Sequence, residues 1–236
     1  MKTIGLLGGM SWESTLWYYQ VINQGIKKQL GGLHSAKIAL YSVDFAEIEK
    51  LQSQGDWQKA GDVLAQVALG VESAGADFLL ICTNTMHKVA PEIQAKLSIP
   101  LLHIADATAE ELIKQGVSKV GLLGTAFTME QGFYKGRLQK KYGLEVVVPN
   151  KTDRQAVHKV IYDELCLGRV KESPKKQYLK IINELAKQGA QGVILGCTEI
   201  GLLVKQKDTE VKLFDTTFIH ANAAVSLALK HVNDTY

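Results

Sequence analysis

An internal repeat constrains this sequence more than any other feature. Three pairs of segments match, in the same order and at spacings of about 112 to 116 residues. The pairs are Ile4–Gly9 with Val120–Thr125, Gly75–Asn84 with Gly189–Thr198, and, more weakly, Ile99–Leu102 with Val211–Phe214. Segments that recur in this way predict two halves built on one plan.

Short runs of β-branched and aliphatic residues alternate with longer amphipathic segments in both halves. The expected strands are Thr3–Leu7, Lys37–Ser42, Phe78–Ile81, Pro100–Leu102, Lys119–Leu123, Glu145–Val148, Gly192–Leu195 and Lys212–Phe214. Between them, Asp56–Ser73 and Ser173–Lys187 carry apolar residues at helical spacing. Strands that alternate with helices predict βαβ units and parallel sheets. The fold class is therefore α/β, with two pseudo-symmetric, doubly wound lobes.

The composition favours a protein that binds a small molecule. The 27 basic and 24 acidic side chains give a net charge of +3, too even for nucleic acid or a membrane surface as the main partner. No apolar run approaches the roughly 20 residues of a membrane span, and the glycine-broken start is unlike a signal peptide. We therefore expect a cytoplasmic protein that binds neither nucleic acid nor membrane.

Cysteine and histidine usage predicts neither a metal site nor a cofactor. Any disulfide scheme for Cys82, Cys166 and Cys197 leaves one thiol over, and neither CxxC nor HExxH occurs. Cys166 lies in a helical pattern, where cysteine is normally a small core residue. No GxGxxG follows the first strand and no GxxxxGK[ST] occurs, so nucleotide cofactors lose their main support.

Polar residues follow two matching strands. These are Cys82-Thr83-Asn84-Thr85 in the first half and Gly196-Cys197-Thr198-Glu199 in the second. Ligands of open parallel sheets bind beyond the carboxyl ends of the strands. If the halves face each other across a pseudo-two-fold axis, Thr83 and Cys197 occupy equivalent positions on opposite walls of one cleft. Taken singly, most of these residues also suit turns and helix caps.

The first turn of each half has two interpretations as well. The Gly8–Ser11 and Gly124–Thr125 turns are expected to open helices, whose free N–H groups attract carboxylates. The alternative is that their glycines merely permit tight strand-to-helix turns. His87 and His103 follow strand ends, and a structural role with satisfied nitrogens is preferred for them over a place lining the cleft.

These motifs resemble the aspartate/glutamate racemase superfamily, in particular its bacterial aspartate/glutamate-specific and broad-specificity amino-acid racemases. The resemblance covers essentially the whole chain and rests on Gly8–Thr15, Cys82–His87 and Gly196–Ile200. It implies an isomerase that uses neither pyridoxal phosphate nor a metal and forms a homodimer. In that family the last segment returns to the first lobe. This implies a first lobe of residues 1–104 plus 216–236, a second of 105–215, and an active site in the cleft between them.

One position departs from the family pattern. In the family two cysteines flank the substrate Cα, and one removes the α-proton while the other returns a proton to the opposite face. Here the first of these positions is Thr83, and Cys82 stands one residue too early, on the other face of its strand. The resemblance implies that Cys197 acts on the L-substrate and that Thr83 relays a proton on the opposite face.

Further residues are candidates for substrate binding. Donors from Asn84, Thr85, Thr198 and the turn that contains Met10 are expected to stabilise the charge that builds toward the substrate carboxylate. Thr83 itself belongs to this set. By resemblance and position alone, Gln52, Thr125 and Glu199 hold the amino or side-chain group of the substrate.

Three other functions remain open. Arylmalonate decarboxylases of the same superfamily use a single cysteine in the second half, and maleate isomerases use cysteine as a nucleophile. A two-lobed protein that binds an acidic ligand without turning it over is the third alternative. Exchange of the Cα proton in D2O separates the racemase from all three.

Overall fold

The computed structural model describes residues 1–230, and the chain divides into two compact units. Unit 1 holds residues 1–104 and the part of the chain from His220, and unit 2 holds Ala105–Ile219. The crossings lie after Ile104 and after Ile219, the second of them inside the last helix. The position expected from the sequence, 215/216, is four residues earlier, at the point where that helix begins.

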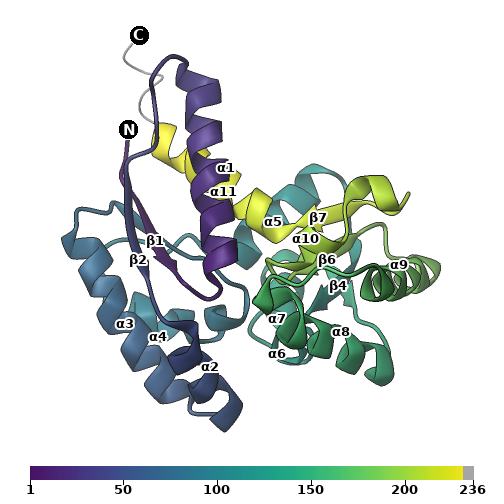
Figure 1. Ribbon diagram of the computed structural model, residues 1–236. Coiled ribbons are helices and arrows are strands. Elements are labelled where there is room, and N and C mark those ends of the chain that lie inside the picture. Colours follow the sequence, from purple (N-terminus) through teal and green to yellow (C-terminus); the bar gives the residue numbers. More distant parts are fainter. Residues whose placement is uncertain (231–236) are drawn as a thin grey trace. The chain divides into compact units, whose positions relative to one another are not determined.

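Unit 1 is built around a three-stranded parallel sheet of order β2-β1-β3. Figure 1 shows β1 and β2 of this sheet. Its elements are β1 (Ile4–Gly8), α1 (Trp12–Leu30), β2 (Ile38–Ser42), α2 (Phe45–Gln54), α3 (Trp57–Ser73), β3 (Phe78–Ile81), the 3-10 helix η1 (Thr85–Val89) and α4 (Ala90–Gln94). The helix α3 begins where the sequence predicts it, because the Asp56 side chain accepts the Lys59 N–H at 3.1 Å.

Unit 2 contains a four-stranded parallel sheet of order β5-β4-β6-β7. Its elements are α5 (Ile104–Lys114), β4 (Lys119–Gly124), α6 (Ala126–Glu130), α7 (Lys135–Tyr142), β5 (Glu145–Val147), α8 (Lys151–Asp163), η2 (Leu165–Leu167), α9 (Glu172–Lys187), β6 (Val193–Gly196), α10 (Ile200–Leu203), η3 (Gln206–Asp208), β7 (Leu213–Asp215) and α11 (Thr216–Leu229). Two of these helices pass a crossing, since α5 starts at Ile104 and α11 ends in unit 1. The predicted α/β fold with parallel sheets is confirmed.

The strand register reproduces the sequence repeat. Leu7 pairs with Ile81 in unit 1, and the equivalent residues Leu123 and Leu195 pair in unit 2. The same correspondence holds two residues earlier in each strand, where Gly5 pairs with Leu79 and Gly121 with Val193. Residues that match in sequence therefore also match in hydrogen-bond register.

The predicted strand Pro100–Leu102 is wrong as a strand, although its pairing partner is right. Leu101 forms a single parallel bridge with Leu79, and Leu79 exchanges hydrogen bonds with Pro100 O and Leu102 N. Pro100 has no N–H to extend the ladder, and α5 starts two residues after Leu102. The segment is the short counterpart of β7, which pairs with Val193 through Leu213.

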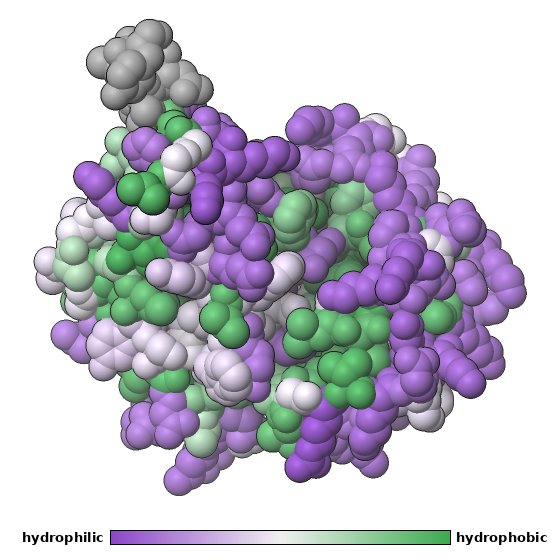
Figure 2. Space-filling model, turned by 45° about the horizontal axis from the view of Figure 1, so that its top comes forward, coloured by the Kyte–Doolittle hydropathy of each residue, from purple (hydrophilic) through white to green (hydrophobic). Residues whose placement is uncertain are grey.

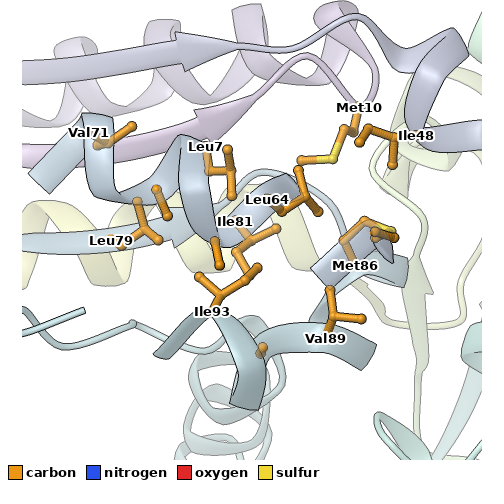
Figure 3. Close-up of a cluster of buried hydrophobic side chains, with 14 of the residues drawn as sticks. Leu7, Met10, Ile48, Leu64, Val71, Leu79, Ile81, Met86, Val89 and Ile93 are labelled. Carbon is orange, nitrogen blue, oxygen red and sulfur yellow. The ribbon is translucent and has the colours of Figure 1, made fainter. Parts of the chain in front are cut away.

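Two apolar clusters cover the faces of the unit 1 sheet. Side chains from α2, α3, η1 and α4 pack against Leu7, Leu79 and Ile81 on one face (Figure 3). Side chains from α1 and α11 pack against Leu6, Leu80 and neighbouring residues on the other. Alternate residues of β3 thus point to opposite faces, as expected for a strand buried on both sides.

On the face drawn in Figure 2, hydrophilic side chains surround separate patches of hydrophobic ones. Within residues 1–230, none of the helices combines the length and the apolar character that a membrane span needs.

Candidate active site

The first candidate turn follows β3. Cys82 continues the ladder, because its N–H donates to the Leu7 carbonyl at 2.9 Å. Its side chain is fully buried in the cluster beside α1 and α11, and this burial raises the pKa of the thiol. Cys82 is therefore a packing residue and a poor proton carrier.

Thr83, Asn84 and Thr85 come next and form a polar group that is almost closed to solvent. Their exposed fractions are 9 %, 2 % and 6 %. The Thr83 carbonyl lies 2.8 Å from Nδ1 of His87 on η1. Polar side chains in such a place need partners within the protein or in a ligand. The turn has the character expected of a binding site.

Met10 and Gln52 lie at the same end of unit 1. The Met10 side chain is buried in the apolar cluster that also contains Ile48 and Met86 (Figure 3). Gln52, on α2, donates from Nε2 to the Met86 sulfur at 2.8 Å. Since Met86 directly follows Thr85, the structure places both predicted residues next to the polar turn. The Met10 side chain is a core group, which leaves its backbone as the polar part.

The second candidate turn follows β6, and two glycines make its geometry possible. Gly124 and Gly196 pair across β4 and β6. A Cβ at Gly124 would stand 2.7 Å from the Gly196 oxygen, and one at Gly196 would stand 2.8 Å from the Leu123 oxygen. Because the strands meet this closely, Thr125 and Cys197 leave the sheet as neighbours at its carboxyl edge.

Cys197, Thr198 and Glu199 form a hydrogen-bonded group at this edge. Oε2 of Glu199 accepts the Cys197 Sγ–H at 2.9 Å and the Thr198 Oγ1–H at 2.9 Å. All three residues are buried, with Cys197 8 % exposed. A buried carboxylate that accepts two donors is well satisfied, which fixes the direction of the thiol.

The surroundings of Cys197 favour the thiol over the thiolate. Burial raises the pKa of Cys197 well above its ordinary value, and the negative charge of Glu199 raises this pKa further. Cys166 and the hydrogen bond to Glu199 act in the same direction. At neutral pH the resting site therefore holds a proton on Cys197, directed at the carboxylate that can accept it.

The backbone N–H groups at the start of α1 and of α6 largely find hydrogen-bond partners within the protein. Thr125 caps α6, since its Oγ1 accepts the Thr128 N–H, and His158 Nδ1 accepts the Ala126 N–H at 3.2 Å. At α1, Ser11 accepts the Ser14 N–H, and the preceding Gly9 N–H donates to Thr15 Oγ1. Gly9 has φ +92°, where a side chain would be strained and would meet the Val43 backbone. These contacts favour the capping and turn interpretation for both segments.

The structure gathers the predicted site residues into two groups, one in each unit. Unit 1 brings together Met10, Gln52, Thr83, Asn84 and Thr85, and unit 2 brings together Thr125, Cys197, Thr198 and Glu199. The pairing of Thr83 with Cys197 stays a prediction. Among residues 1–230 no group of His, Cys, Asp or Glu side chains is arranged to hold a metal ion.

Comparison with known proteins gives the family. The family of Asp/Glu/hydantoin racemases matches residues 7–224. This chain belongs to that family. Its predicted resemblance to the aspartate/glutamate racemases is thereby confirmed.

Three relatives match nearly the full length of this chain. A candidate Asp/Glu racemase from Yersinia pestis is 59 % identical over 97 % of this chain and 100 % of its own, with a TM-score of 0.90. An aspartate racemase homologue from Pyrococcus horikoshii is 37 % identical over 97 % and 99 %, with a TM-score of 0.83. The broad specificity amino-acid racemase RacX of Bacillus subtilis is 26 % identical over 97 % of this chain and 99 % of its own.

Proposed function

We propose that this member of the racemase family is a cofactor-independent amino-acid racemase, with Thr83 and Cys197 serving opposite faces of the substrate Cα. Family membership supports a racemase, and the similarity to RacX and to an aspartate racemase homologue supports an amino acid as substrate. Aspartate and glutamate are the first substrates to test.

The observation that carries the proposal is the equivalence of Thr83 and Cys197. Each stands just beyond the strand that pairs with the first strand of its unit, and the two strand pairs share one register. A racemase needs one group to remove the α-proton and another to supply a proton from the opposite side. Two equivalent turns on two copies of one plan suit this requirement.

Cys197 is proposed to act on the L-enantiomer. Its proton first passes to Glu199, 2.9 Å away, and the thiolate then takes the α-proton. The electron pair of the broken C–H bond moves toward the substrate carboxylate. The cationic ammonium group of the substrate, bound nearby, favours the thiolate that burial and Glu199 disfavour in the empty site.

Thr83 is proposed to complete the reaction on the other face. Its hydroxyl proton passes to Cα as another proton reaches Oγ1 from water, so that no free alkoxide has to form. The proton gained by Cys197 and Glu199 returns to water. Over one turnover the α-proton is lost to solvent and a solvent proton is gained, so D2O labels the product.

The remaining site residues are proposed to stabilise the charge on the carboxylate. Asn84, Thr85 and Thr198 offer donors beside the two proton carriers, and a well-placed donor of this kind is worth about 3–4 kcal/mol in the transition state. Met10 contributes its backbone. Gln52 and Thr125, at the edges of the two groups, are proposed to hold the amino or side-chain end of the substrate.

The arginines do not offer an obvious clamp for a side-chain carboxylate. Arg137 forms a two-pronged ion pair with Asp106, and Arg154 binds Glu130 and the Pro149 carbonyl. Arg169 is exposed and lies just after η2, outside both strand-end turns. Substrate choice therefore falls to the neutral donors of the two turns. This supports a panel that includes neutral amino acids beside aspartate and glutamate.

We further propose that the enzyme needs neither pyridoxal phosphate nor a metal, acts as a homodimer and works in the cytoplasm. Full activity after dialysis against EDTA and no visible pyridoxal absorbance are the expected results for the first two. Light scattering on the eluting protein measures the oligomeric state. A strong loss of rate on dialysis would contradict cofactor independence.

The deciding experiment follows the Cα–H signal of candidate L- and D-amino acids in D2O by proton NMR. We expect exchange and racemisation with wild type and neither with Cys197→Ser. Phenylmalonate is the control, because a threonine in place of the first cysteine also suits a single-cysteine decarboxylase. If phenylmalonate releases carbon dioxide and no amino acid exchanges its α-proton, the protein is a decarboxylase and not a racemase. Binding without exchange would indicate a non-catalytic protein.

A further inference from the structure

His87 contacts the Thr83 turn and the first crossing at the same time. Its ring is 1 % exposed, with Nδ1 2.8 Å from the Thr83 carbonyl oxygen and Nε2 3.2 Å from the Ile104 nitrogen. Ile104 is the first residue of α5 and the last residue of unit 1 before the chain passes into unit 2. A single side chain therefore connects the site turn to the point where the chain leaves the unit.

The two contacts fix the tautomer of the ring. A backbone N–H can only donate, so Nε2 accepts from Ile104. A carbonyl oxygen can only accept, so Nδ1 carries the proton and donates it to Thr83. With one nitrogen donating and the other accepting, the ring is neutral. Both nitrogens are committed to the backbone, and His87 is not available as an acid or a base.

Neighbouring rings hold the crossing from a second side. His220 lies 2.8 Å through Nε2 from the Leu102 carbonyl and 2.8 Å through Nδ1 from the Tyr18 hydroxyl. The ring of His103 stands 4.5 Å from that of His87 between centroids. The segment of residues 102–104 is thus hydrogen-bonded to side chains of both η1 and α11. These contacts anchor His87, which can then position Thr83.

The second unit has no such device. Gly201 occupies the repeat position of His87, since it follows Cys197 by four residues as His87 follows Thr83. It has no side chain to bridge with, and a Cβ there would stand 2.5 Å from Asp215 Oδ2. In that unit Glu199 orients the proton carrier instead. The bridge therefore belongs to the Thr83 turn and has no counterpart at Gly201.

We propose that His87 is a positioning residue for the delivery of a proton by Thr83. This inference rests on the proposed function. The Nδ1–H holds the Thr83 carbonyl and so fixes the peptide that follows Thr83. The Thr83 Cα is attached to this peptide, so the direction of its side chain is fixed as well. A thiol compensates for a small misplacement through its reactivity, whereas a weakly acidic hydroxyl has to be placed accurately. Loss of this hydrogen bond affects the Thr83 face and leaves the Cys197 face intact.

Two variants separate the two contacts of the ring. His87→Asn puts an amide N–H near the place of Nδ1 and keeps the bond to Thr83. His87→Gln puts its amide near the place of Nε2, where the oxygen can accept from Ile104, and loses the donor to Thr83. Both replace the ring by an amide, so the variants differ mainly in which contact they retain.

The measurement is the ratio of α-proton exchange with retained configuration to racemisation, starting from the L-amino acid in D2O. When Thr83 fails to deliver, the α-proton on Cys197 exchanges with the deuteron that Glu199 holds, 2.9 Å away. Cys197 then returns deuterium to the same face of Cα, and the L-enantiomer is labelled without inversion. We expect His87→Gln to raise this ratio about tenfold, toward that of Thr83→Ala, and His87→Asn to stay near wild type. The ratio does not depend on how much protein is folded, so a destabilised variant remains informative.

Other outcomes have distinct meanings. Equal ratios in wild type and both variants would make His87 a purely structural residue and overturn the proposal. A ring with Nε2 protonated in the 15N spectrum of wild type would overturn it independently of any rate. No exchange in wild type with any amino acid would refute the proposed function itself, and with it the reaction that His87 serves.

Discussion

The Cys197 thiol donates to the Glu199 carboxylate over 2.9 Å, two residues farther along the same turn. This contact combines two effects of opposite sign. The charge of Glu199 raises the pKa of the thiol, and the same oxygen is the nearest acceptor for the proton that the thiol has to lose. Glu199 thus destabilises the thiolate in the resting site. During turnover the same residue gives the thiol proton a nearby acceptor.

Glu199→Gln separates these effects. Removing the charge lowers the pKa of Cys197, so iodoacetamide should alkylate this thiol faster at pH 8 than in wild type. Racemisation should fall by about 10²-fold, because the proton acceptor is lost. Both rates are measured in a Cys166→Ala background, which removes the half-exposed thiol. Slower alkylation together with slower racemisation would show that Glu199 does not raise the pKa of Cys197.

Cys197→Ser and Cys82→Ala should have opposite profiles. The first removes the proposed base and lowers racemisation by about 10³-fold or more, with little change in the free energy of unfolding. The second leaves a small cavity in the core and costs roughly 1–2 kcal/mol of stability, with the rate near wild type. Rates and urea unfolding curves of both variants test this. A serine variant that keeps more than about a tenth of the wild-type rate contradicts the role of Cys197.

His220 should make stability depend on pH. Burial lowers the pKa of His220 from 6.5 to about 4. Between these values an unfolded chain binds a proton that the folded chain refuses, so stability is complete above pH 6.5 and falls as pH drops toward 4. The shift corresponds to about 3 kcal/mol. Below pH 4 both states are protonated and this loss ends.

Urea unfolding at pH 7, 6, 5 and 4.5 measures this effect as the difference between wild type and His220→Gln. The variant should be less stable at pH 7, and the difference should shrink toward pH 4.5. His34→Gln is the matched control, because it makes the same substitution at an exposed position. A constant difference between wild type and His220→Gln would exclude this role for His220.

Local patterns predicted most of the fold because each element carries its own signal. The strand Phe78–Ile81 and the helix that starts after Asp56 come out as expected, since an apolar run and a capping residue define them locally. Pro100–Leu102 fails as a strand because its length depends on where α5 begins. The repeat contributed what no single element could, the equivalence of Thr83 and Cys197 in register.

The contacts of the histidines could not be read from the sequence. Tyr18 and His220 are 202 residues apart, and His87 reaches Ile104 only after the chain has passed through α4. No local pattern encodes such partners, so the sequence indicated a structural role for His87 without its geometry. The contact of Cys197 with Glu199 is local, and a thiol two residues before a carboxylate in a strand-end turn is a signal that could have been noticed.

Thr83→Cys tests the departure from the family pattern. Enantiomers have equal free energies, so kcat/KM is the same in both directions for any variant. The weak acidity of a hydroxyl therefore appears in kcat and KM separately, with Cys197 removing a proton from the L-enantiomer more effectively than Thr83 does from the D-enantiomer. A thiol at position 83 should raise the D-to-L kcat about tenfold. Initial rates in both directions, with aspartate, glutamate and neutral amino acids, give these constants.

Thr83→Ser keeps a hydroxyl of the same chemistry and should stay near wild type. If Thr83→Ala is as active as wild type in both directions, Thr83 is only a turn residue. The second proton then comes from a group other than Cys82, whose thiol is closed into the core.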